Sequence, residues 1–264
     1  MKYFKNVTSK SADFYVYGTI VDEKEPDFWT GEISTTEVDP NDFKNELDQL
    51  KGVKDLNIYI NSPGGSVFAS STIVSLLKRF RENNGAKIHS FVDGLCASAA
   101  TYLCMVADDV NVYQNSIMMI HKPMSFAMGN ANDFQKEIDV LNTIENDMMV
   151  PMYLNKSLVD EIEMKNLIEN ETWFSGNEND VFFIGNFFKV NCLDEAKEYV
   201  ACVSKELFRN YKNLPKKLSD LAEEEKVAEP IKEEPKQHEI VEENQKLDYS
   251  AFEDILSSLK GGKK

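Results

Sequence analysis

Basic residues, histidine and cysteine are all scarce in this sequence, and each shortage narrows what the protein can do. The 264 residues include 29 Lys and Arg against 45 Asp and Glu, which gives a net charge of −16. Such a charge disfavours nucleic acid and anionic membranes, since binding to both depends on Lys and Arg. The 4 cysteines lack metal-ligand spacing. We therefore predict no nucleic-acid or membrane partner, no metal and no cofactor.

Long hydrophobic runs are missing as well. No stretch approaches the length that crosses a bilayer, and the first residues lack the apolar centre of a signal peptide. Cys96 and Cys104 lie within an apolar pattern, which is typical of buried, reduced thiols. These features predict a soluble, cytoplasmic protein.

Short apolar strands alternate with amphipathic helices over the first half of the chain. The expected strands cover residues 14–21, 56–60, 87–92, 109–113 and 117–120, and the expected helices begin at Asp39-Pro40, near Phe68 and after Ser98. This alternation predicts an α/β fold with a largely parallel sheet flanked by helices.

The second half contains two longer helical patterns and then a change of composition. Helices are expected over Ala131–Asn155 and Leu193–Tyr211, and a Glu/Lys-rich stretch with three prolines follows. We predict a folded domain over residues 1–211, a disordered acidic linker over 212–248 and a short amphipathic segment over 249–264. Within the last, Tyr249–Leu259 would form a helix if a partner offers a groove, or else the tail only aids solubility.

The stretch Gly94–Thr101 places a serine where a strand gives way to a helix. The strand over residues 88–92 leads into a tight turn with Gly94, and Ser98 follows. A hydroxyl there lies among free N–H groups at the positive end of a helix, where an oxyanion is stabilised. The alternative is a Ser that caps the helix. Cys96 is interpreted as a packing residue rather than a catalytic thiol.

Two further features give this serine possible partners. Gly64-Gly65 joins a strand to a helix and is either a tight turn or half of an oxyanion hole. His121 follows a strand and precedes Lys122-Pro123, so it can serve as a general base, whereas His89 lies inside a strand and His238 in the polar tail.

The acidic partner is less well defined by the sequence. Asp108 and Asp109 end the helix that Ser98 begins, so they should lie roughly 15 Å away. Glu171 precedes an aromatic pair that could hold it in place.

Four motifs, taken together, resemble a known family. INSPGGSVFASS, GLCASAATYLCMVAD, MMIHKP and ENETWFS stand in the order and approximate spacing of the Clp protease proteolytic subunit. YVYGTIVDE, the loop with Trp29 and the Gly129-Asn130 segment resemble the phage branch, the prohead (head maturation) proteases. The resemblance covers roughly Phe14–Leu207.

The resemblance implies a catalytic triad. Ser98 would be the nucleophile, His121 the general base and Glu171 the acid. The housekeeping subunit has Asp at this last position, so a neighbour such as Glu169 is an alternative.

The resemblance also implies an oxyanion hole, a substrate contact and a fold. The N–H groups of Gly65 and Ala99 would bind the oxyanion, and Gly64, Ser66 and Val67 would contact the substrate. The fold would be the crotonase-like spiral of βαβ units, with the long helix as the handle through which subunits form a homo-oligomeric ring.

The expected function is a serine endopeptidase that cleaves capsid or scaffold proteins during phage head maturation, in the host cytoplasm or the assembling prohead. One alternative is a peptidase subunit that works with an ATP-driven unfoldase. Others are an acyl-CoA hydratase or isomerase with the same fold, and a non-catalytic assembly protein.

Overall fold

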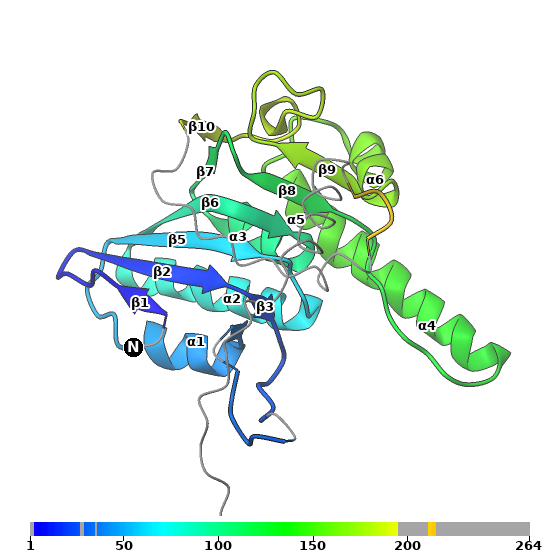
Figure 1. Ribbon diagram of the computed structural model, residues 1–264, viewed down its shortest axis with the longest axis horizontal. Helices are drawn as coiled ribbons and strands as arrows, with labels where there is room; N and C mark the ends of the chain where they lie inside the picture. Colours follow the sequence, from blue (N-terminus) through cyan, green and yellow to red (C-terminus); the bar gives the residue numbers. More distant parts are fainter. Residues whose placement is uncertain (1–2, 27–28, 35, 195–210, 215–264) are drawn as a thin grey trace, which may run out of the picture. The chain divides into compact units, whose positions relative to one another are not determined.

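A mixed sheet with helices packed on it forms the body of the protein (Figure 1). The structure, a computed structural model, describes residues 3–26, 29–34, 36–194 and 211–214. The strands are β1 Phe4–Lys5, β2 Ser11–Tyr17, β3 Thr19–Ile20, β4 Glu37–Val38, β5 Asp55–Ser62, β6 Lys87–Ala97, β7 Asp109–Tyr113, β8 Ile117–Ile120, β9 Thr172–Ser175 and β10 Asn191–Leu193. The α-helices are α1 Pro40–Leu47, α2 Val67–Asn84, α3 Thr101–Val106, α4 Ala131–Thr143, α5 Val150–Leu154 and α6 Glu161–Glu169.

The strands of the main sheet follow the order β1-β2-β5-β6-β7-β10, and β8 and β9 extend from β6. β2, β5, β6, β7, β8 and β10 pair in parallel, whereas β1–β2 and β8–β9 are antiparallel. Along β2 the side chains of Ala12, Phe14 and Val16 are buried in alternation, and Phe14 packs on Phe43 of α1. The predicted largely parallel α/β fold is confirmed.

Strand β6 is longer than predicted, and on the edge away from β5 it pairs with two different neighbours. His89–Val92 pairs with β7, and Leu95–Ala97 pairs with β8. The prediction that the strand ends at Val92 was wrong, because Gly94 lies at an irregularity within the strand rather than in a turn after it. The Leu95 N–H donates to Asn61 Oδ1 at 3.1 Å. A side chain of β5 thus takes part in the hydrogen bonding between β5 and β6 at the irregularity.

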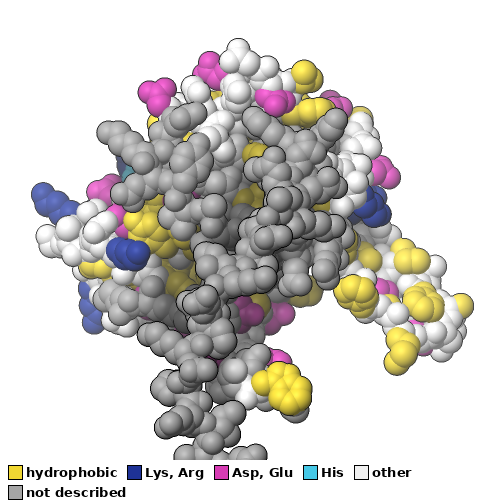
Figure 2. Space-filling view, in the orientation of Figure 1, with side chains coloured by type: hydrophobic (Ala, Val, Ile, Leu, Met, Phe, Trp, Pro, Cys, Tyr) yellow, Lys and Arg dark blue, Asp and Glu magenta, His cyan; other side chains and the backbone are white. Residues whose placement is uncertain are grey.

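The helix predicted over Ala131–Asn155 consists of three consecutive segments. α4 leads into a π-helical segment, Ile144–Met149, and α5 follows it. α4 contains no buried residue and projects from the sheet (Figure 1). Phe134, Ile138 and Val140 are about half exposed on it, and hydrophobic side chains gather on this projection (Figure 2). Its role as a handle between subunits remains a prediction.

The predicted C-terminal elements fall largely outside the described residues. The helix expected over Leu193–Tyr211 is replaced at its start by β10, which ends at Leu193, and residues 195–210 are not described. The predicted linker is described only over residues 212–214, and the segment 249–264 lies outside the described part. No described helix is long and apolar enough to cross a membrane.

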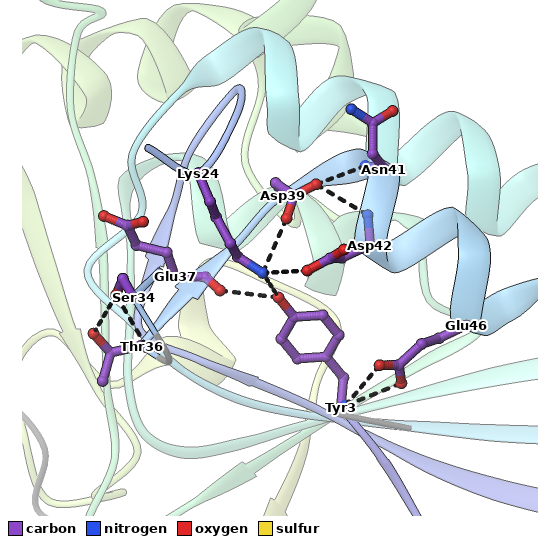
Figure 3. Close-up of polar contacts among 9 residues, drawn as sticks. All are labelled: Tyr3, Lys24, Ser34, Thr36, Glu37, Asp39, Asn41, Asp42 and Glu46. Atoms are coloured by element: carbon purple, nitrogen blue, oxygen red, sulfur yellow. Dashed lines mark hydrogen bonds and ion pairs between the residues drawn. The ribbon is translucent and has the colours of Figure 1, made fainter. Parts of the chain in front are cut away.

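A buried ion cluster anchors the segment after β3 (Figure 3). Lys24 Nζ lies 2.9 Å from Asp39 and 2.6 Å from Asp42, and it also donates to the Tyr3 hydroxyl. Asp39 caps α1 by accepting from the Asn41 and Asp42 amides. Burial opposes ionisation of Asp39, but the Asp42 amide and Lys24 together hold its pKa below the usual value. The cluster therefore joins α1 to the chain that leaves β3.

Candidate active site

Ser98 lies in a strained turn directly after β6. Its φ of +54° is in the left-handed region, which a non-glycine residue rarely adopts. The turn is fixed by two hydrogen bonds: Ser70 Oγ donates to the Ala99 carbonyl at 2.6 Å, and Thr101 Oγ1 donates to the Ser98 carbonyl at 2.6 Å. Ser98 therefore does not act as a helix cap, because it begins the 3-10 turn Ser98–Ala100 and its side chain contacts His121 instead.

His121 follows β8 by one residue, and its Nε2 lies 2.8 Å from Ser98 Oγ. β8 pairs with β6 with Ala97 opposite Met119, so the two strands bring serine and histidine together. Burial lowers the pKa of His121, and the charge of Glu171 partly opposes this. The imidazole is therefore mostly neutral near pH 7 and can accept a proton.

The other two histidines do not take part in this arrangement. His89 Nδ1 lies 2.7 Å from Asp109 Oδ2, and His238 is outside the described residues. Asp108 accepts from the Ile88 amide and forms an ion pair with Arg81. Asp109 contacts His89, so neither Asp108 nor Asp109 is bound to His121.

Of the two glycines in the β5–α2 connection, Gly64 lies against the serine turn and Gly65 lies against Ile20 of β3. Gly64 has φ +93°, and a Cβ there would be 2.8 Å from the Ser98 Cβ and 2.9 Å from the Ala99 nitrogen. Gly65 forms a parallel bridge with Ile20, in which the Gly64 carbonyl and the Ser66 amide make the hydrogen bonds. The N–H of Gly65 therefore points to the other side of this chain segment.

A cavity of about 250 Å³ opens between these elements. Ser98, His121, Gly64, Gly65 and Ala99 line it, so the structure brings five of the residues proposed from the sequence to one place.

Of the other residues expected to contact substrate, Val67 also lines the cavity, but Ser66 does not. The Ser66 side chain accepts from the Ala69 amide as the cap of α2 and donates to Asp22 at 2.6 Å. Among the described residues, no group of three or more His, Cys, Asp or Glu could hold a metal ion.

The charge of Glu171 raises the pKa of His121, but the two side chains are not hydrogen-bonded to each other. The Glu171 carboxylate accepts from the Lys212 amide at 3.0 Å and the Asn213 amide at 2.7 Å. The Trp173 indole donates to it at 3.4 Å. Glu171 also has a left-handed φ of +48°. The alternative acid, Glu169, is largely exposed and lies 3.9 Å from Lys122.

Tyr211 is a part of this site that sequence reasoning missed. Its hydroxyl donates to the Pro63 carbonyl at 2.8 Å, and its ring packs edge-on against both His121 and Trp173. It also lines the cavity. No local sequence pattern indicates these contacts, because the residues that Tyr211 touches lie far earlier in the chain.

Cys96 is buried beneath the serine turn, with its sulfur 3.7 Å from that of Cys104. Burial raises its pKa well above the usual value, which keeps the thiol protonated. This agrees with a packing role.

The model of the Clp protease family matches residues 45–182 of the chain, which is more than half of it. The chain belongs to the Clp protease family. It is 31% identical over 109 residues to the ATP-dependent Clp protease proteolytic subunit 2 of Synechococcus sp. (strain CC9605), a match that covers 40% of this chain and 50% of the relative. With the ATP-dependent Clp protease proteolytic subunit of Bacteroides thetaiotaomicron it shares 34% identity over 91 residues, 34% of this chain and 40% of that protein.

The matched segment of this Clp protease family member thus spans half or less of the length of these relatives. Ser98, His121 and the glycine pair lie within residues 45–182, the part that matches the family, whereas Tyr211 lies beyond residue 182. The contact of Tyr211 with the site is therefore a feature of this chain outside the family match.

Proposed function

We propose that this protein is a serine endopeptidase that works through an acyl-enzyme. The observation that carries the proposal is the 2.8 Å contact between His121 Nε2 and the Oγ of Ser98, a residue whose backbone is strained. His121 takes the proton from Ser98 as Oγ attacks the peptide carbonyl, and the same imidazole then protonates the leaving amine. A water molecule, deprotonated by His121, releases the acyl group in the second half of the reaction.

The amides of Gly65 and Ala99 are proposed to bind the oxyanion. Gly64 allows this, because only a residue without Cβ fits beside Ser98 and the Ala99 nitrogen. Glu171 is proposed as the acid that stabilises the imidazolium, since its charge raises the pKa of His121. Gly64 and Val67 contact the substrate from the cavity wall.

For the substrate we propose capsid or scaffold proteins during phage head maturation. The motifs around the catalytic residues and the loop with Trp29 support this choice. The exposed apolar residues of α4 support assembly into a ring, because a helix with no buried residue gains its packing partner from another subunit.

Mass spectrometry of co-expressed coat and scaffold proteins tests activity, nucleophile and substrate together. Wild type and the control Ser75→Ala, a change at an exposed α2 serine, should give the same cleavage products, and Ser98→Ala should give none. Equal products with Ser98→Ala would overturn the proposal. A fluorophosphonate probe that leaves Ser98 unlabelled would favour the non-catalytic assembly protein.

A second candidate is a peptidase fed by an ATP-driven unfoldase. A row of half-buried aromatic rings on the sheet face away from α1 favours it: Tyr59 stacks on Tyr15 and on Phe91, each at 4.9 Å between centroids. Such a surface suits a partner with apolar contacts. ATPase-dependent degradation of a folded reporter, lost with Tyr59→Ala, would support this candidate over the first.

A further inference from the structure

Four residues from beyond the family match, Tyr211–Leu214, form what we term the capping segment. Its contacts reach three parts of the site. Tyr211 binds the Pro63 carbonyl beside the glycine pair and packs on His121. Leu214 and Tyr211 pack on a small apolar cluster that includes Trp173 and Met119. The Asn213 side chain donates to the Asn170 carbonyl at 2.7 Å.

The capping segment also binds the acid of the site directly. The Lys212 amide lies 3.0 Å from Glu171 Oε2, and the Asn213 amide lies 2.7 Å from Oε1. Hydrogen bonds to a carboxylate are stronger than those between neutral groups, so the two amides hold the carboxylate in one orientation. In this orientation Glu171 makes no hydrogen bond to His121 among the described contacts.

The space left beside Ser98 is small for a protease. The cavity holds about 250 Å³, with Tyr211 as one of its walls. Clefts that bind a drug-sized ligand enclose ~300–1,000 Å³. An endopeptidase must bind several residues of an extended chain, and Tyr211 stands in the wall of the cavity beside the nucleophile.

We propose that the capping segment is an autoinhibitory contact: it turns Glu171 away from His121 and narrows the cleft until it is displaced. Release of the two amides lets the Glu171 carboxylate turn to the imidazole, and departure of Tyr211 opens the cleft to peptide. The effect on peptide cleavage rests on the proposed peptidase function, whereas the effect on Glu171 and His121 does not.

The test compares Asn213→Pro with Asn213→Ala in the full chain. Proline has no N–H and removes the 2.7 Å bond to Glu171, while alanine keeps the amide and loses only the bond to Asn170. We expect Asn213→Pro to increase the rate of fluorophosphonate labelling at Ser98 about tenfold, the effect of losing one charge-assisted hydrogen bond. Asn213→Ala should remain within about twofold of wild type.

A second readout does not depend on activity. Titration of the His121 ring protons by NMR should show a higher pKa in Asn213→Pro, because a carboxylate that bonds the imidazole stabilises its charged form. Lys122, the next residue in the chain, pairs with Glu145 and Glu169, and neither substitution alters these two pairs. Adding Glu171→Gln to Asn213→Pro should abolish the increase.

The outcomes separate the two proposals. Labelling and His121 pKa that both equal those of wild type would overturn the autoinhibitory contact and leave the peptidase intact. A raised pKa without labelling in any variant would support the contact and overturn the peptidase. If Asn213→Pro does not fold, Tyr211→Phe, which removes the hydroxyl that binds the Pro63 carbonyl, should still label faster than wild type, and equal labelling would overturn the contact.

Discussion

The hydroxyl of Ser70 donates a 2.6 Å hydrogen bond to the carbonyl of Ala99, so the buried face of α2 holds the turn that carries Ser98. We predict that Ser70→Ala lowers the free energy of unfolding by about 1 kcal/mol, because it removes a buried hydrogen bond to the Ala99 carbonyl. Labelling of Ser98 should also slow as the strained turn relaxes. Urea unfolding and probe labelling measure the two effects. Ser75→Ala, on the exposed face of the same helix, should change neither.

The state of His121 predicts how activity depends on pH. Its pKa is lowered by burial, so the rate should rise through a pKa below the ordinary value of about 6.5 as the base loses its proton. Glu171→Gln removes a charge that raises this pKa, so the rise should move to lower pH while the plateau rate falls. Labelling rates measured from about pH 4 to about pH 8 test this.

Glu169→Gln is the matched control for that experiment, because Glu169 is largely exposed and lies near Lys122 instead. Its pH profile should coincide with that of wild type. A wild-type profile whose rise lies above about 6.5 would contradict a desolvated base.

The close approach of Gly64 to the nucleophile predicts a loss of activity without an equal loss of stability. A Cβ at this position would lie 2.6 Å from the Ala97 carbonyl and 2.8 Å from the Ser98 Cβ. Gly64→Ala should therefore displace the turn and reduce kcat about 100-fold or more, the scale of losing an oxyanion donor. Gly52 has a similar positive φ of +81°, but a Cβ there would meet no atom within 4 Å, so Gly52→Ala is the matched control. It should keep full activity, so an equal loss in both variants would point to backbone strain alone.

The ion cluster of Figure 3 predicts that replacing Lys24 lowers the free energy of unfolding more than replacing the exposed Lys44. The Lys24 side chain is only 6% exposed, and Lys24→Met leaves Asp39 buried without its cation. We expect a loss of about 3–5 kcal/mol in the free energy of unfolding. Lys44→Met removes an exposed pair with Asp48 at 2.6 Å, which should cost about 0–1 kcal/mol. Chemical denaturation measures both free energies of unfolding. Equal losses would show that the buried cluster stabilises the fold no more than an exposed ion pair does.

Local patterns predicted the central strands and the helices up to α5, but not β1, β4, α6, β9 or β10. β7 and β8 begin and end at the predicted residues, and Asp39-Pro40 opens α1 as its capping chemistry indicates. The end of β6 was mispredicted because Gly94 is a turn signal in sequence, while the side chain of Asn61 from another strand completes the pairing.

Only those residues of the candidate site that stand in a recognisable motif could be predicted from the sequence. Ser98, His121 and the glycine pair stand in such motifs, and the structure places them together. The capping segment has no motif, because its amides bind through the backbone and any residue except proline supplies an N–H. Ser66 was expected near substrate, but its hydroxyl is used by the first turn of α2.

One edge of β6 is divided between β7 and β8, and this has a consequence for how the protein tolerates sequence change. Ala97 and Met119 are paired across β6 and β8, and Ser98 and His121 follow those strands by one residue each. The separation of nucleophile and base is thus set by the backbone ladder of the sheet and not by a loop. Loops around the cleft can consequently lengthen, shorten or change sequence, and so adapt the protein to new substrates, while the reacting pair keeps its spacing.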